Sequence, residues 1–160
     1  MKVVIKNKIF SFTGSSFVLD ENGKKAFRVK GRFLSPTRVK WICDPQGHKL
    51  YKVRNKFWNW FKHSAYVYDA DGNKLAKIVH PFFGIKKFIV QGYQNEILID
   101  GKFFSLESTI MKDGQPVGKI TRNLELFRDA FTLEADAAEM PFMIALVIAI
   151  DNITDQKMSE

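Results

Sequence analysis

The sequence predicts a mainly β protein in which about twelve antiparallel strands close into a barrel around a hydrophobic C-terminal helix. Three observations support this fold class. An uncharged apolar run stands near the end of the chain, hairpin-like motifs recur before it, and further apolar runs of strand length fill the rest. A chain of 160 residues with 46% hydrophobic content is long enough to bury one core. We therefore expect a single domain over residues 1–154, followed by a short polar tail at 155–160.

The uncharged run at 140–150 predicts a helix. Its 11 residues are too few to cross a bilayer, because a membrane-spanning helix needs about 20 consecutive apolar residues. The run is also longer than a usual strand of roughly 5–6 residues. Pro141 is favoured in a first helical turn, and Asp136 and Glu139 place negative charge near the positive end of a helix dipole. We expect one helix over residues 138–152.

The predicted helix has no polar face. Its side chains are apolar around the whole circumference, so the rest of the chain has to surround it. The residues expected to form this buried helix surface are Phe142, Ile144, Leu146, Val147, Ile148 and Ile150.

Recurring hairpin motifs supply the surrounding sheet. Each consists of two strand-like runs joined by an Asp-Gly, Asn-Gly or Gln-Gly turn, and such pairs provide the positive φ that hairpin turns require. The copies are FVLDENGKKAFRV (17–29), WICDPQGHKLYKV (41–53), YVYDADGNKLAKI (66–78), the more divergent TIMKDGQPVGKI (109–120) and the tighter ILIDGKFF (97–104). Because Phe, Val, Ile, Tyr and Trp favour strands, these motifs predict consecutive antiparallel hairpins.

The number of strand-like runs predicts a wide barrel. Additional apolar runs lie at 3–12, 33–35, 85–91 and 124–134. A barrel of about 8 strands is filled by its own side chains, whereas one of about 11 strands holds a helix, which is about 10–12 Å across. A dozen strands therefore suffice to enclose the helix. The residues expected to face inward toward it include Phe27, Val29, Val39, Trp41 and Val53.

These segments resemble a known family. The series KNKIFSF, FVLDENGKKAFRVKGRF and YDADGNKLAKI, closed by FMIALVIAIDNI, is similar to the LURP-one-related proteins over essentially the whole chain. The most specific element is Asp151-Asn152-Ile153 after the apolar helix. That family is related to the tubby C-terminal domain and, more remotely, to phospholipid scramblases. The resemblance implies a roughly twelve-stranded barrel around a C-terminal helix and no catalytic residues.

The family resemblance does not identify lipid-binding residues in this sequence. Tubby domains are associated with phosphoinositide binding, but no such motif matches this sequence residue by residue.

Motifs for catalysis or cofactor binding are missing from the sequence. His48, His63 and His80 lie far apart and lack the spacing of zinc ligands. The DADGNK segment at 69–74 resembles the start of a calcium loop, but such a loop needs Gly at its sixth position and Glu at its twelfth. A hairpin turn explains the segment better. No nucleophile elbow, Walker loop or dinucleotide fingerprint is present. We expect a protein without catalytic activity, cofactor or metal.

The cysteine content and the N-terminal residues predict the cellular compartment of the protein. Cys43 is the single cysteine, so it forms no internal disulfide, and its place in the strand-like VKWIC predicts a buried structural thiol. The opening Met1-Lys2-Val3-Val4 lacks the apolar region of a secretory signal. These features predict a cytoplasmic protein that is at most peripheral to a membrane.

Positive charge is concentrated in the first part of the chain. Residues 1–90 contain 19 Lys or Arg and 5 Asp or Glu, a net charge of +14, whereas residues 91–160 contain 6 and 12, a net charge of −6. Alternation along the strands directs many of these cations outward. The candidate binding residues are Arg28, Lys30, Arg32, Arg38, Lys40, Lys52, Arg54 and Lys56, with Trp58 and Trp60 as interfacial anchors.

Three classes of partner suit such a surface. An anionic lipid or membrane surface ranks first, mainly through the family resemblance, because headgroups meet Lys and Arg while Trp settles at the interface. A protein-interaction or signalling scaffold ranks second. Nucleic acid ranks third, since phosphates and stacked bases use the same side chains. A surface that only solubilises the barrel remains an alternative to all three.

Overall fold

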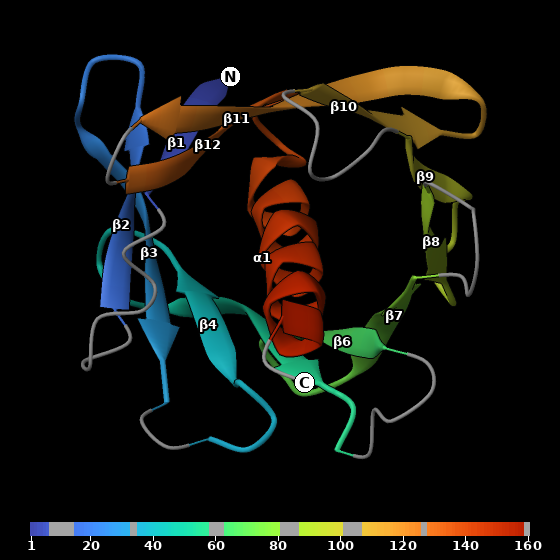
Figure 1. The fold of residues 1–160 in the computed structure, drawn as a ribbon. Coiled ribbons are helices and arrows are strands. Elements are labelled where there is room, and N and C mark those ends of the chain that lie inside the picture. The colour runs from blue at the N-terminus through green and yellow to red at the C-terminus, as the bar shows by residue number, and fades with distance from the viewer. Residues whose placement is uncertain are drawn as a thin grey trace.

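The computed structural model describes residues 1–6, 15–32, 35–57, 63–80, 87–100, 107–125 and 128–158 (Figure 1). The elements are β1 (Lys2–Lys6), β2 (Ser15–Asp20), β3 (Lys25–Gly31), β4 (Lys40–Cys43), β5 (Lys49–Asn55), β6 (Ser64–Asp69), β7 (Lys74–Val79), β8 (Lys87–Gln91), β9 (Ile97–Asp100), β10 (Glu107–Lys112), β11 (Gln115–Glu125), β12 (Arg128–Ala135) and α1 (Met140–Met158).

The strands form a closed antiparallel barrel in chain order. Each strand of the described chain pairs with its sequence neighbours, and β1 pairs with both β2 and β12. Figure 1 shows the ring of strands with α1 inside it. The predicted fold class, a twelve-stranded barrel around a single C-terminal helix, is confirmed.

The strand order divides the barrel into two ends. Short links join β2 to β3, β4 to β5 and the following pairs at one end, which we call the turn end. The turn-end links are 21–24, 44–48, 70–73, 92–96, 113–114 and, before α1, 136–139. We call the opposite end the connection end, where the strand ends are joined by 7–14, 32–39, 56–63, 80–86, 101–106 and 126–127. Because the helix starts at the turn end, it ends at the connection end.

Aspartates close the turns as the sequence predicts. The Asp20 carboxylate accepts the backbone N–H groups of Asn22 (2.9 Å) and Lys24 (2.8 Å), and Gly23 has a φ of 76°. The Asp69 carboxylate accepts the backbone N–H of Asn73 at 2.8 Å and its side-chain amide at 2.9 Å. These hydrogen bonds, the side-chain one foremost, hold the pKa of Asp69 below its ordinary value. These two turns are therefore each fixed by their own carboxylate.

The helix occupies the interior of the barrel. Its side chains are buried from Phe142 to Ile153, which confirms the prediction of an enclosed apolar helix. It begins at Met140 rather than 138, because its first helical hydrogen bond runs from the Met143 N–H to the Glu139 carbonyl. It also continues to Met158, beyond the predicted helix end at residue 152. Residues 153–158 contain no Gly or Pro to stop it.

The predicted direction of β4 is wrong. Ile42 and Lys40 face inward and are buried, while Trp41 lies on the outer face opposite Lys30 of β3 and Lys52 of β5. Val39 precedes the strand and is half-buried. The sequence pattern placed Trp41 in the interior, but the pairing of β4 with its neighbouring strands places it on the outer face.

The other inward predictions agree with the structure. Val29 and Val53 are fully buried, and Phe27 packs against the core. Of the additional predicted runs, 3–12 corresponds to β1, 85–91 to β8, and 124–134 to the end of β11 and most of β12. Residues 7–14, 33–34, 81–86 and 126–127 lie outside the described residues.

A charge placed inside the barrel tests the enclosure of α1. Leu146→Asp and Ile148→Asp are each expected to destabilise the protein by more than about 4 kcal/mol, because the new carboxylate has neither water nor a cation beside it. Circular dichroism with urea titration, together with soluble yield, measures the effect. Ala137→Asp, at an exposed residue before the helix, is the control and should unfold like wild type. Wild-type stability of both helix variants would contradict an internal helix.

Candidate functional site

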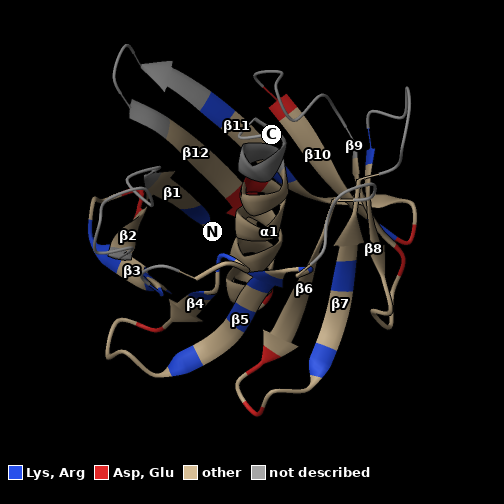
Figure 2. Cartoon of the chain, turned by 60° about the horizontal axis from the view of Figure 1, so that its bottom comes forward, with Lys and Arg blue, Asp and Glu red and all other residues tan. Residues whose placement is uncertain are grey.

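Four of the predicted cations share the outer face of the barrel. Arg28 and Lys30 lie on β3, and Lys52 and Arg54 lie on β5. Figure 2 shows Lys and Arg along β3, β5 and β7, and acidic residues at the turns that precede β5 and β7. The outward orientation of these four side chains follows from Val29 and Val53, which alternate with them and are buried.

Cations and aromatic rings alternate across this face. The register places Trp41 between Lys30 and Lys52, and Tyr68 between Lys52 and Lys74. The row therefore crosses five neighbouring strands, from β3 to β7, with one side chain from each. Directly paired residues on one face of a sheet lie about 4.5–5.5 Å apart at their Cβ atoms, so long side chains in the row are within reach of their neighbours.

Lys52 is held between two rings of this row. Its Nζ lies 5.3 Å from the centroid of the Trp41 ring and 4.6 Å from that of Tyr68. The Nζ of Lys49 lies 4.2 Å from the Trp41 ring. Such cation–π contacts contribute about 0.5–1 kcal/mol at exposed sites, and they restrict the long side chains to positions along the surface.

Arg54 extends the pattern to the two tyrosines of β6. Its guanidinium carbon lies 5.3 Å from the Tyr68 ring and 6.0 Å from the Tyr66 ring. The Nε–H donates a hydrogen bond of 2.9 Å to the Tyr68 hydroxyl. The Nζ of Lys74 lies 5.7 Å from the Tyr66 ring. The Arg54 guanidinium is thus oriented by one ring plane and one hydroxyl.

A second aromatic centre lies on β2. The Phe17 ring is exposed and has the Lys25 Nζ at 4.0 Å and the Arg28 guanidinium carbon at 5.6 Å from its centroid. We call the part of the outer surface formed by these side chains of β2–β7 the cation–aromatic face. Its residues are Phe17, Lys25, Arg28, Lys30, Trp41, Lys49, Lys52, Arg54, Tyr66, Tyr68 and Lys74.

Acidic side chains near this face are committed to the turns. Asp44 accepts the backbone N–H groups of Gly47 (2.7 Å) and His48 (2.8 Å), and its second oxygen lies 2.7 Å from the His48 ring. Asp20 and Asp69 are engaged in the same way. The described parts of β3, β4 and β5 contain no acidic residue. The middle of the face is therefore positive, and the negative charge lies at the turn end.

Cys43 lies beneath the cations of this face. It pairs with Arg28 on one side and Lys49 on the other, and its side chain is completely buried. Burial raises the pKa of the thiol, and the charge of Lys30 opposes this increase only in part. The thiol stays protonated at neutral pH, and the predicted burial of Cys43 is confirmed.

The remaining predicted residues lie elsewhere. Arg32 and Lys56 are exposed just beyond the ends of β3 and β5, at the connection end. Lys40 is a correction, because it faces the interior, where its Nζ lies 3.8 Å from the Asp151 carboxylate. Trp58 and Trp60 lie outside the described residues.

Arg38 holds the end of the helix through its backbone. It is half-buried with a φ of 48°, and its carbonyl accepts a hydrogen bond of 3.1 Å from the Asn152 side chain. The Asn55 side chain donates to the Asn152 carbonyl at 3.2 Å. Together with the pair of Lys40 and Asp151, these contacts explain why Asp-Asn follows the apolar run. Both residues are buried inside the barrel and tie α1 to the segments around β4 and β5.

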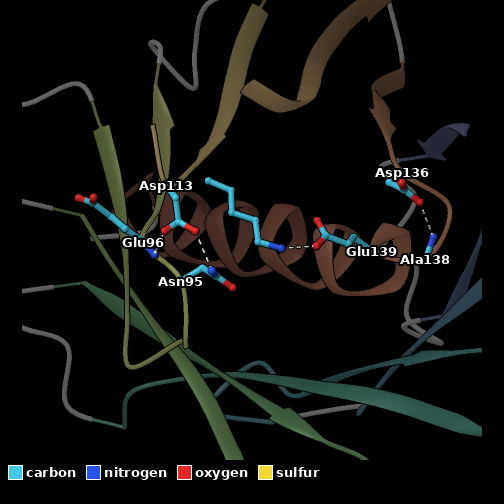
Figure 3. Close-up of polar contacts among 7 residues, drawn as sticks. Asn95, Glu96, Asp113, Asp136, Ala138 and Glu139 are labelled. Carbon is cyan, nitrogen blue, oxygen red and sulfur yellow. Dashed lines mark hydrogen bonds and ion pairs between the residues drawn. The ribbon is translucent and has the colours of Figure 1, made fainter. Parts of the chain in front are cut away.

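The turn end holds the other end of the helix (Figure 3). Lys112 of β10 forms an ion pair with Glu139, which raises the pKa of the lysine. Asp113 accepts the Glu96 backbone N–H at 2.9 Å and the Asn95 amide at 2.7 Å. The Asp136 carboxylate accepts the Ala138 N–H at 3.0 Å. Polar contacts therefore fix α1 at both mouths of the barrel.

Sequence reasoning missed the aromatic half of the site. It did not include Tyr66, Tyr68 or Phe17, and it directed Trp41 inward. The signal was present in YVYD, where the two tyrosines flank the buried Val67 and must share the face opposite to it. Lys25, Lys49 and Lys74, which lie at the start of their strands, were also omitted.

Comparison with known proteins agrees with this architecture. The family model described as LURP-one-related matches residues 1–151. The chain belongs to the LURP-one-related family. No curated protein and no solved structure matches this LURP-one-related chain. Within the described residues, no helix of this LURP-one-related barrel has the length and apolar character needed to cross a membrane.

A double-mutant cycle tests the buried pair of Lys40 and Asp151. Lys40→Met alone is expected to cost about 3–5 kcal/mol, because it leaves the buried carboxylate without the lysine charge. The double variant Lys40→Met/Asp151→Leu should recover a large part of that loss, since neither buried charge remains. Urea unfolding measures the three free energies. Strictly additive losses would contradict the coupling of these residues.

Proposed function

We propose that this barrel is a non-enzymatic module that binds anionic lipid surfaces through its cation–aromatic face. The observation that carries the proposal is the row of alternating cations and rings from Lys30 to Lys74. Each Lys or Arg near an anionic membrane contributes about 1 kcal/mol, so several on one face give useful affinity together. The outer wall of a barrel is convex, which suits an extended surface better than an enclosed ligand.

Orientation of the cations by the rings supports this function. A free lysine loses rotamer entropy when it meets a headgroup, whereas Lys52 is already restricted by Trp41 and Tyr68. Arg54, restricted by two rings and a hydroxyl, presents a planar donor group to phosphate. Tyr and Trp are also the side chains that settle at a membrane–water interface. The face therefore combines attraction with little loss of entropy on binding.

Charge reversal on the face tests the proposal. The variant with Arg28, Lys30, Lys52 and Arg54 changed to Glu is expected to lose co-sedimentation with vesicles of phosphatidylcholine and phosphatidylserine. Wild type should sediment with them at low salt and be released toward 1 M salt, where screening acts over about 3 Å. Vesicles of phosphatidylcholine alone and single-stranded DNA distinguish lipid binding from general polyanion binding.

A control variant reverses charges outside the face. Lys2, Lys24 and Lys119 are exposed and lie away from both the face and the connection end, and their change to Glu lowers the net charge from +8 to +2. This variant should keep a large part of the vesicle binding. Equal loss in both variants would show that only total charge matters, and no sedimentation of wild type at low salt would refute lipid binding. Thermal melting of both variants checks that they remain folded.

Removal of the central ring tests the role of the aromatics. Trp41→Leu keeps all the positive charge but removes the ring that restricts Lys49 and Lys52. We expect vesicle affinity to fall about 3- to 10-fold, corresponding to roughly 0.7–1.4 kcal/mol, while salt dependence stays unchanged. A titration with anionic vesicles at two salt concentrations measures both quantities. Unchanged affinity would show that the ring has no part in binding.

A further inference from the structure

The two ends of the barrel differ strongly in composition. In the sequence, the links at the connection end contain 12 aromatic residues, 7 Lys or Arg and no Asp or Glu. The links at the turn end contain 1 aromatic residue, 1 Lys and 7 Asp or Glu. The sequence after residue 153 adds Asp155, Lys157 and Glu160, a net charge of −1 against the +7 of the connection-end links. Of the connection-end links, the structure describes residues 32, 35–39, 56–57, 63 and 80, and the other residues of these links lie outside the described part of the chain.

Three described residues at the connection end are exposed, two of them basic and one aromatic. Arg32 and Lys56 are exposed directly after β3 and β5. Phe57 follows Lys56 and is 70% exposed, the largest exposed fraction among the large hydrophobic side chains described. A phenyl ring next to cations gains free energy when it leaves water for an apolar layer under anionic headgroups. A soluble polyanion offers no such layer.

The turn end has the opposite character. Asp71 and Glu96 are exposed there, and Asp20, Asp44 and Asp69 are held in place by hydrogen bonds to their turns. The carboxylates of Asp20, Asp44 and Asp69 cannot turn away from an approaching negative surface without breaking these hydrogen bonds. An anionic membrane therefore repels this mouth of the barrel.

We propose that the barrel docks with its connection end toward the bilayer, so that Phe57 enters the interfacial layer while Arg32 and Lys56 meet lipid phosphates. The turn end then points into the solvent, together with Lys25, Lys49 and Lys74 at the starts of their strands. The part of the cation–aromatic face nearest the connection end, Trp41, Arg54 and Tyr66, lies next to the membrane. This orientation rests on the proposed function. It specifies the partner as a bilayer with an accessible apolar layer, and not merely a polyanion.

Single-cysteine labelling tests the orientation. An environment-sensitive fluorophore is attached at Phe57→Cys and Pro36→Cys for the connection end, and at Ala70→Cys for the turn end. All three parent residues are exposed, and wild type serves as the labelling blank because Cys43 is buried. The probe is a vesicle of phosphatidylcholine and phosphatidylserine with spin-labelled lipid as quencher. Pro36→Cys keeps Phe57, so a loss of affinity in Phe57→Cys does not prevent the test.

The labels at residues 36 and 57 are expected to brighten and to be quenched at least several-fold more than the label at residue 70. Phe57→Ala should also weaken vesicle binding by a similar factor at each salt concentration at which wild type still binds, because the lost ring carries no charge. Quenching at residue 70 that equals or exceeds the others, or vesicle binding without quenching at any position, would overturn the orientation while leaving lipid binding intact. Absence of sedimentation by wild type would refute both proposals.

Discussion

From Phe142 to Ile153 every side chain of α1 is buried, so this helix has to be enclosed on all sides. A single sheet or a helix pair covers only part of such a surface, whereas a closed barrel covers all of it. The barrel in turn needs the helix, because twelve strands enclose more space than their own side chains fill. Sheet and helix are therefore stable only together.

Polar contacts fix the position of the helix rather than supply the main stabilisation. The Lys112–Glu139 pair lies at one mouth, and Asn152, bound to the Arg38 carbonyl, lies at the other. An apolar helix inside an apolar barrel buries a similar area in many rotational and axial positions. Apolar packing alone therefore specifies the position of α1 only weakly. Directional hydrogen bonds at both ends remove this freedom. The Asp-Asn pair after the apolar run is thus the element that sets the register of α1.

The sequence was sufficient for the fold because turn chemistry and helix polarity are local signals. The Asp-Gly turns and the uncharged run each identify their element without knowledge of its neighbours. The direction of β4 was not accessible in this way, because it depends on contacts distant in sequence. Lys40 is buried beside Asp151, 111 positions later, and Trp41 is turned outward by Lys30 and Lys52 on other strands. The cations of the site were found from alternation, but their rings required the register.

The closed barrel limits which surfaces the proposed binding can use. The helix occupies the interior, and all twelve strands have two neighbours, so the described chain offers no free sheet edge. The proposed binding therefore uses the outer wall and the mouths. The turns require carboxylates to close them, which makes one mouth acidic for structural reasons. The opposite mouth and the wall of β3–β7 are free of that requirement. Among the described residues, Arg32, Lys56 and Phe57 are exposed at that mouth, and the alternating cations and rings lie along the wall.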